Sequence, residues 1–154
     1  MNEEPALQPE SPTVGVHASA CPVEQLDPPP IIPLPSDPSA TSSAPHLRQP
    51  AIAGPLRDWG PVPTMIEGRS ETSGILLHKG SDGSECGVWQ CTPGTWVCHV
   101  VRDEFCHFLR GRCTYTHESG EIIEIEPDTA AFFPAGWTGT CRVHETVRKV
   151  YMIR

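Results

Sequence analysis

Aromatic residues are missing from the first third of this sequence, and proline is abundant there. No Trp, Tyr or Phe occurs before Trp59, whereas 12 of the 18 prolines lie within residues 1–54. A segment with so little bulky apolar surface cannot offset the entropy that it would lose on ordering. We therefore predict a disordered Pro/Ser/Ala-rich arm over residues 1–54. Residues 55–154 are enough for one small domain with one hydrophobic core.

A long apolar run and an excess of basic residues are also lacking. Glycine, proline and charged residues interrupt every apolar stretch, and the first ten residues, MNEEPALQPE, lack the apolar core of a signal peptide. We therefore expect a cytoplasmic protein that does not enter a membrane. The chain has 11 Lys and Arg against 19 Asp and Glu, a formal net charge of −8. This balance disfavours nucleic acid as a partner.

No C-x-x-C pair occurs among the seven cysteines, so the sequence lacks the signature of a zinc ribbon. The odd count argues against a complete set of intrachain disulfides, and we expect reduced thiols. Most of the cysteines fit small buried apolar positions. Two alternatives stay open: one or two cysteines face a ligand pocket, or Cys98, Cys106 or Cys113 is a redox-sensing thiol with a lowered pKa.

Short alternating or apolar segments, separated by glycine, proline and polar turns, make up the rest of the chain. No window has a sustained 3.6-residue apolar period, so we predict little helix and eight or nine strands. The predicted strands cover residues 74–78, 86–91, 95–101, 104–110, 113–116, 122–126, 130–133, 138–143 and 148–154. Such short, evenly spaced strands predict an all-β sandwich or small barrel.

Two glycine-containing motifs lie within these strands. In DEFCHFLRGRC, Glu104 is followed after six residues by Gly111, and a Pro-Asp turn precedes the corner Pro134-Ala135-Gly136. With the phrases GVWQCTPGTW, FFPAGWTGT and VRKVYMI, this order resembles the cupin superfamily. In particular it resembles the small single-domain cupins grouped with ureidoglycine aminohydrolase and the ethanolamine-utilisation cupin. The resemblance implies a double-stranded β-helix, or jelly-roll, barrel over residues 55–154.

The same resemblance makes Glu104 a candidate catalytic residue and metal ligand. Metal-binding cupins carry a histidine pair three or four residues before this glutamate, and here those positions offer Cys98 or His99 beside a valine. The place of the last histidine ligand holds Gly139. Glu104 and His99 are therefore the tentative ligands of one divalent ion, Mn, Fe or Zn. A lone carboxylate and imidazole would bind such an ion weakly, so a metal-free barrel is the alternative.

Four further residues are candidates for contacting a ligand inside the barrel. Alternation along the strand places Cys106 on the same face as Glu104. Cys98 faces inward if His99 does not, because one residue of register exchanges the two. Tyr115 offers a hydroxyl group and Trp137 a ring, although both also fit simple packing roles.

Three functions stay open from the sequence. The first is an enzyme that acts on small carbonyl or C–N compounds, as the resemblance to ureidoglycine aminohydrolase suggests, with Glu104 as general acid or base. The second is a metal-free cupin that binds or senses a small polar metabolite without catalysis. The third is a thiol sensor. Since barrels of this kind often pair, we also expect a homodimer.

Overall fold

Residues 44–154 are described by the structure, a computed structural model of the chain. These residues form nine β-strands and no helix. The strands are β1 (Arg57–Pro61), β2 (Met65–Glu67), β3 (Glu71–Lys79), β4 (Glu85–Cys91), β5 (Gly94–His99), β6 (Glu104–His117), β7 (Ile122–Ile125), β8 (Ala130–Phe133) and β9 (Thr138–Ile153). The predicted all-β class is confirmed. The first 43 residues of the predicted disordered arm lie outside the described residues.

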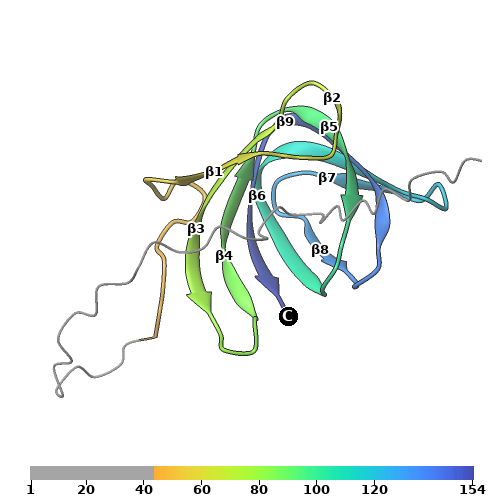
Figure 1. Cartoon of the computed structure of the whole chain (residues 1–154). Coiled ribbons are helices and arrows are strands. Elements are labelled where there is room, and N and C mark those ends of the chain that lie inside the picture. Colours follow the sequence, from red (N-terminus) through yellow and green to blue (C-terminus); the bar gives the residue numbers. More distant parts are fainter. Residues whose placement is uncertain (1–43) are drawn as a thin grey trace, which may run out of the picture.

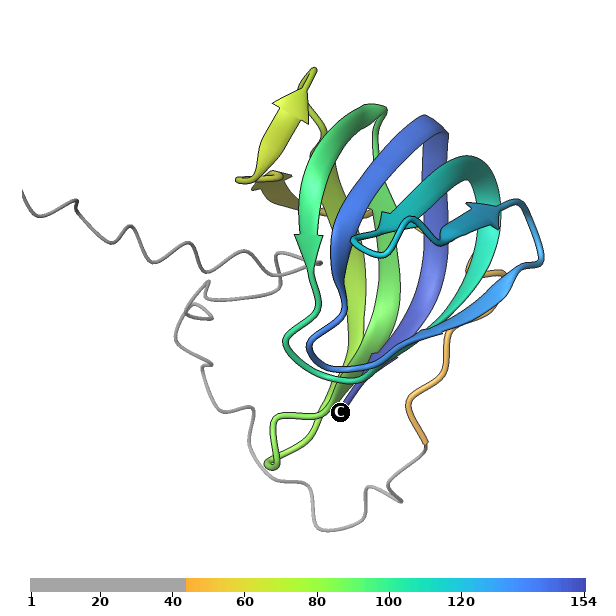
Figure 2. The same ribbon diagram turned by 90° about the vertical axis from the view of Figure 1, so that its right-hand side faces the viewer.

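Two long, strongly bent strands, β6 and β9, form the centre of the fold and pair with each other along their whole length. On its other edge, β9 pairs with β5 through its first half and with β4 through its second half. On its other edge, β6 pairs with β8 and then with β7. The sheet therefore curls into two facing halves, as Figures 1 and 2 show from two directions. This is the double-sheet barrel that the sequence predicts.

The bend in β6 depends on Gly111. Its φ is +76°, and a Cβ atom added there would lie 2.2 Å from the carbonyl oxygen of Thr146 in β9. Only glycine adopts this conformation without a steric penalty and also allows the neighbouring backbone to come so close. Three register shifts between β6 and β9 fall between Phe108 and Cys113, at the same place. Both long strands thus cross from one half of the barrel to the other here.

The predicted strands differ from the observed ones mainly at these bends. The sequence suggests a break at Gly111 and another near residues 144–147, but β6 and β9 each continue through the bend. In the sequence, glycine and charged residues at these places look like the end of a strand. In the structure the two strands bulge and bend there, and the ladder of hydrogen bonds between them continues. The short strands β1 and β2 were not predicted, because neither has an apolar alternation.

The core lies between the two halves of the barrel. Its largest fully buried apolar side chains are Trp89, Trp96, Phe108 and Phe133. Trp96 and Phe108 come from alternating strands whose other face is more exposed, as the burial patterns of β5 and β6 show. Trp89 comes from β4, which is buried on both faces near its centre. The same inward positions also carry a few charged side chains, which form the candidate site described below.

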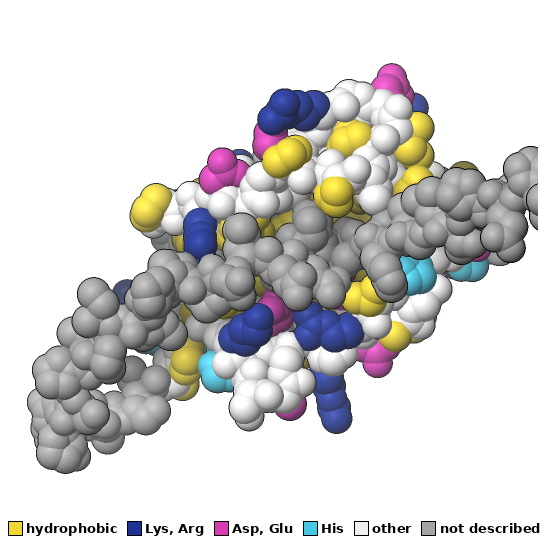
Figure 3. Space-filling model, viewed as in Figure 1, with side chains coloured by type: hydrophobic (Ala, Val, Ile, Leu, Met, Phe, Trp, Pro, Cys, Tyr) yellow, Lys and Arg dark blue, Asp and Glu magenta, His cyan; other side chains and the backbone are white. Residues whose placement is uncertain are grey.

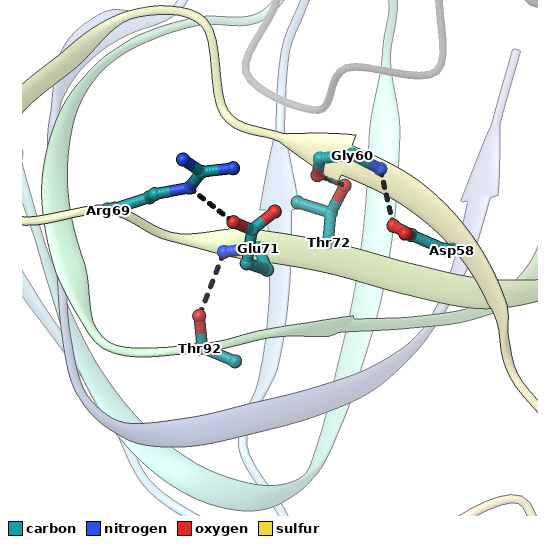
Figure 4. A network of polar contacts seen from close by, with 6 residues as sticks. All are labelled: Asp58, Gly60, Arg69, Glu71, Thr72 and Thr92. Carbon is teal, nitrogen blue, oxygen red and sulfur yellow. Dashed lines mark hydrogen bonds and ion pairs between the residues drawn. The ribbon is translucent and has the colours of Figure 1, made fainter.

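The edge formed by β1 and β3 is held by local polar contacts, shown in Figure 4. The hydroxyl of Thr72 donates a hydrogen bond to the carbonyl oxygen of Gly60, and the Gly60 amide donates to the carboxylate of Asp58. The Glu71 amide donates to the hydroxyl of Thr92, in the turn that follows β4. These bonds satisfy backbone groups at an irregular pairing of β1 with β3.

The segment just before β1 is attached to the outer face of the barrel by Arg148. The Nη1 atom of Arg148 lies within hydrogen-bond distance of the carbonyl oxygens of Pro50, Ala51 and Ala53, and its Nε donates to Gln90. Burial lowers the pKa of Arg148 from its ordinary value. The last residues of the predicted arm, 50–53, therefore contact the barrel.

The surface carries charges of both signs. Figure 3 shows Lys and Arg side chains interspersed with Asp, Glu and apolar side chains on the face in view. Among residues 44–154 no helix has the length and apolar character needed to cross a membrane.

Candidate functional site

A buried ion pair between β6 and β9 is the main polar feature of the barrel interior. Lys149 follows Arg148 in β9, and because side chains alternate along a strand, Arg148 faces outward and Lys149 inward. The Lys149 Nζ atom lies 2.7 Å from Oε1 of Glu104, at the start of β6. The two side chains are only 1% and 4% exposed. The predicted site residue Glu104 is thus an interior carboxylate whose partner is an ammonium group.

Aromatic rings surround the ammonium group. The Lys149 Nζ atom lies 4.8 Å from the ring centroid of Trp89 and 5.7 Å from that of Phe108. Both residues are opposite Lys149 in register, Trp89 on β4 and Phe108 on β6. A cation over an aromatic face gains electrostatic stabilisation that grows when water is excluded. The lysine chain is therefore held between two rings, and its end is directed to Glu104.

Buried ion pairs are poor sources of net stability. Removing two charges from water costs several kcal/mol for each ion, and apolar residues of similar size often serve a core equally well. The cost of this ion pair makes its place in the barrel interior the candidate functional site. Lys149 was not predicted from the sequence. Its signal was present, because Lys149 interrupts an otherwise apolar inward face of β9.

Two of the predicted ligand residues, Cys98 and Cys106, lie in the same part of the interior and are almost completely buried. Burial raises the pKa of each thiol to about 12, although the charge of Lys149 acts in the opposite direction. A redox-sensing thiol needs a lowered pKa. The structure therefore argues against a thiol sensor at these two positions, and both cysteines line the site as neutral groups.

The register of β5 decides between Cys98 and His99. Cys98 and Trp96 face the core, whereas Val97 and His99 lie on the outer face of the strand. His99 is half-buried there. Strand alternation thus separates His99 from the interior carboxylate of Glu104, with which it was tentatively paired as a metal ligand.

Tyr115 and Trp137, the other two predicted ligand residues, belong to an aromatic cluster. The ring of Tyr115 lies 4.7 Å from that of Phe133 and 5.9 Å from that of Trp137. Phe133 pairs with Glu104 across β6 and β8. The cluster therefore forms an apolar wall beside the ion pair, with Trp137 at its more exposed end.

The described residues do not fit the predicted Mn, Fe or Zn ion. Among residues 44–154, no group of three or more His, Cys, Asp or Glu side chains is placed to hold a metal ion. The Glu104 carboxylate is engaged by Lys149, and this fixed positive charge would repel a metal cation at the same oxygen atoms.

Comparison with known proteins agrees with the barrel and with its motifs. The family described as the EutQ-like cupin domain matches residues 78–151. The chain is a cupin-superfamily protein that resembles the EutQ-like family. The match spans β4 to β9 and includes both partners of the ion pair. The search of curated proteins found no match for this cupin.

Several solved structures are similar to this cupin. A protein of unknown function of the DUF861 family from Pseudomonas syringae pv. tomato is 20% identical, with a TM-score of 0.61 over 66% of this chain. This cupin spans 45% of the length of that protein. The EutQ protein of Clostridium difficile is 17% identical, with a TM-score of 0.49 and 55% and 68% of the two chains covered. The putative ethanolamine utilization protein Q of Salmonella typhimurium is 22% identical, with a TM-score of 0.48 and 54% and 68% covered. At these identities the likeness concerns the fold alone.

Proposed function

We propose that this chain is a metal-independent cupin that binds a small polar metabolite inside the barrel, at the Glu104–Lys149 pair. The observation that carries the proposal is the 2.7 Å contact between these buried side chains. A positive charge stands beside the carboxylate that the cupin resemblance assigns to a metal. The pair is surrounded by the aromatic and thiol side chains described above.

The ion pair offers complementary hydrogen-bonding groups to a ligand. The Lys149 ammonium donates hydrogen bonds and the Glu104 carboxylate accepts them. The indole N–H groups of Trp89 and Trp96 are buried and have no hydrogen-bond partner among the described residues. Buried N–H groups cost free energy when they stay unpaired. A carbonyl compound with its own N–H groups, such as an amide or a ureido compound, would match both the donors and the acceptor. Its carbonyl oxygen would accept from the ammonium and indole N–H groups, and its N–H groups would donate to the Glu104 carboxylate.

Metal analysis and ligand binding together test this proposal. We expect the full chain, grown with Mn, Fe and Zn present, to contain far less than one metal ion per molecule. We expect amide and ureido compounds to bind in ligand-observed NMR, and binding to disappear in the double variant Glu104→Gln/Lys149→Met. The variant His99→Ala is the control and should bind normally. Near-stoichiometric metal that is lost in Glu104→Gln would overturn the proposal.

Catalysis is a second candidate, because the pair places a proton donor and a proton acceptor in contact. Such a pair is suited to general acid–base chemistry on a carbonyl or C–N compound, in which Glu104 accepts a proton and Lys149 supplies one. Release of ammonia from ureido or amide compounds, abolished in Lys149→Met, would support this activity. Binding without turnover would leave the ligand-binding function alone.

We also propose that the protein forms a homodimer through the outer face of β6, β8 and β9. Three large apolar side chains lie side by side there, because Phe105 is opposite Phe132 on β8 and Met152 on β9. They are 49%, 60% and 55% exposed, respectively. A contiguous apolar row of this kind is typical of an interaction surface, and a flat row can pair with its own copy about a two-fold axis. Sedimentation analysis should show a dimer that becomes monomeric in Phe105→Ser/Phe132→Ser.

A further inference from the structure

A second interior carboxylate, Glu85, lies in the same cross-strand row as Glu104. Glu85 begins β4 and Glu104 begins β6, and both are opposite Ile153 of β9. Neighbouring strands are about 4.8 Å apart, so the backbones of the two glutamates are roughly 9 to 10 Å apart across Ile153. Glu85 shares its strand face with the core residues Trp89 and Cys91. Its side chain is therefore directed into the barrel, toward the end where Glu104 lies.

The Glu85 carboxylate is buried but poorly compensated. Its side chain is only 1% exposed, and Oε1 has no hydrogen-bond partner among the described residues. Its other oxygen, Oε2, lies 3.8 Å from Nζ of Lys79, whose side chain is 61% exposed. An ion pair that long, with a solvated lysine, contributes little. A buried carboxylate oxygen without a donor carries a desolvation penalty, which a donor on a bound ligand would relieve.

Two positive groups near this end of the barrel contact partners other than Glu85. Arg102, in the loop before β6, donates a hydrogen bond to the carbonyl oxygen of Gly83 in the β3–β4 hairpin. Lys149 contacts Glu104. Neither group supplies the hydrogen bond that Oε1 of Glu85 lacks among residues 44–154.

We infer that Glu85 is the recognition residue for a protonated amine on the metabolite that this cupin binds. The inference rests on the proposed function and narrows the ligand class to small amines that also carry a carbonyl group. The carbonyl group lies at the Lys149–Glu104 pair, and the ammonium group of the ligand donates to Glu85. Among residues 44–154, the two carboxylates belong to no group of three or more side chains that could hold a metal ion.

Glycinamide and glycolamide form a matched pair of probes, because they differ only in an ammonium group against a hydroxyl group at neutral pH. We expect the full chain to prefer glycinamide roughly tenfold or more at constant ionic strength, since a charge-assisted hydrogen bond contributes about that much. In Glu85→Gln this preference should fall to within about twofold, while glycolamide binding stays unchanged. Glu145→Gln, which removes an exposed carboxylate, is the control and should keep the full preference.

Different results separate the inference from the proposed function. Equal binding of the two probes to the wild-type protein, or a preference that survives in Glu85→Gln, overturns the role of Glu85 alone. If neither probe binds, or both bind unchanged to Glu104→Gln/Lys149→Met, the proposed function itself fails.

Thermal unfolding of the ligand-free protein gives a second, independent readout. If Glu85 is a binding group that lacks a donor, Glu85→Gln keeps or raises the Tm and abolishes the rise in Tm caused by glycinamide. A purely structural Glu85–Lys79 pair predicts the reverse, a Tm that falls equally in Glu85→Gln and Lys79→Met.

Discussion

Replacing one partner of the Glu104–Lys149 ion pair should lower the free energy of unfolding much more than replacing both partners together. In Lys149→Met the Glu104 carboxylate loses its partner, and in Glu104→Gln the Lys149 ammonium loses its partner. Each group stays in a nearly water-free position. At 2.7 Å the direct attraction is about 6 kcal/mol with an effective dielectric constant near 20. Reorganisation and water entry reduce the net loss for each single variant to roughly 3 to 5 kcal/mol.

The double variant Glu104→Gln/Lys149→Met should behave differently, because no buried charge is left unpaired. We expect it to lie within about 1 to 2 kcal/mol of the wild-type protein, and the coupling between the two sites to exceed roughly 2 kcal/mol. Urea-induced unfolding, followed by tryptophan fluorescence, measures all four proteins on one scale. For a domain of this size each single variant should also lower the Tm by on the order of 20 °C.

Two results would refute this account of the site. If each single variant loses less than about 1 kcal/mol, both groups have access to water and the interior position of the pair is wrong. If the double variant loses the sum of the two single losses, the side chains act independently and their contact has no energetic weight.

Three other predictions concern the frame around the site. Gly111→Ala should lower the free energy of unfolding by roughly 2 to 4 kcal/mol, because a Cβ atom would meet the β9 backbone. Gly120→Ala is the control: a Cβ atom there meets nothing within 4 Å, and the free energy of unfolding should fall by about 1 kcal/mol. Arg148→Met should speed amide hydrogen exchange in residues 51–54 with little change in the barrel strands. Unchanged exchange in residues 51–54 would mean that the Arg148 contacts do not hold the segment. The folded-state pKa of about 12 for Cys98 and Cys106 lies above the ordinary thiol value of 9.0. Unfolded thiols therefore ionise first, and the free energy of unfolding should fall as the pH rises from 9 toward 12; Cys98→Ala/Cys106→Ala should flatten this slope in urea titrations, and an equally steep slope in that variant would contradict it.

Much of the fold was accessible from local patterns. Alternation of apolar and polar residues over a segment such as 104–110 predicts a strand, because successive side chains of a strand face opposite sides. Glycine and proline mark the turns and the corner at Pro134 for equally local reasons. The same local pattern predicted a strand end at Gly111, and this was wrong. Glycine ends many strands, but here it bends β6, which continues to His117.

The candidate site was accessible only in part. Glu104 and Cys106 were predicted to face the interior, and both are buried in the structure. The sequence left open whether Cys98 or His99 faces inward, and the register of β5 turns Cys98 inward. Lys149 was not predicted, because lysine is an outward residue in most strands and its partner lies 45 positions away in the sequence. Glu85 was overlooked for a similar reason, since it stands next to a polar turn and reads as a surface residue.

The order of residues along the chain was enough to predict short strands and turns of an all-β sandwich or small barrel, because backbone preferences and strand alternation act over a few neighbouring residues. The cupin barrel with Glu104 inside it was what the family resemblance implied. The pairing of Lys149 with Glu104, the inward choice of Cys98 over His99 and the row that joins Glu85 to Glu104 depend on the register between distant strands. That register is set when β9 packs between β4, β5 and β6 and the two halves close on one core, and no short segment contains the information by itself.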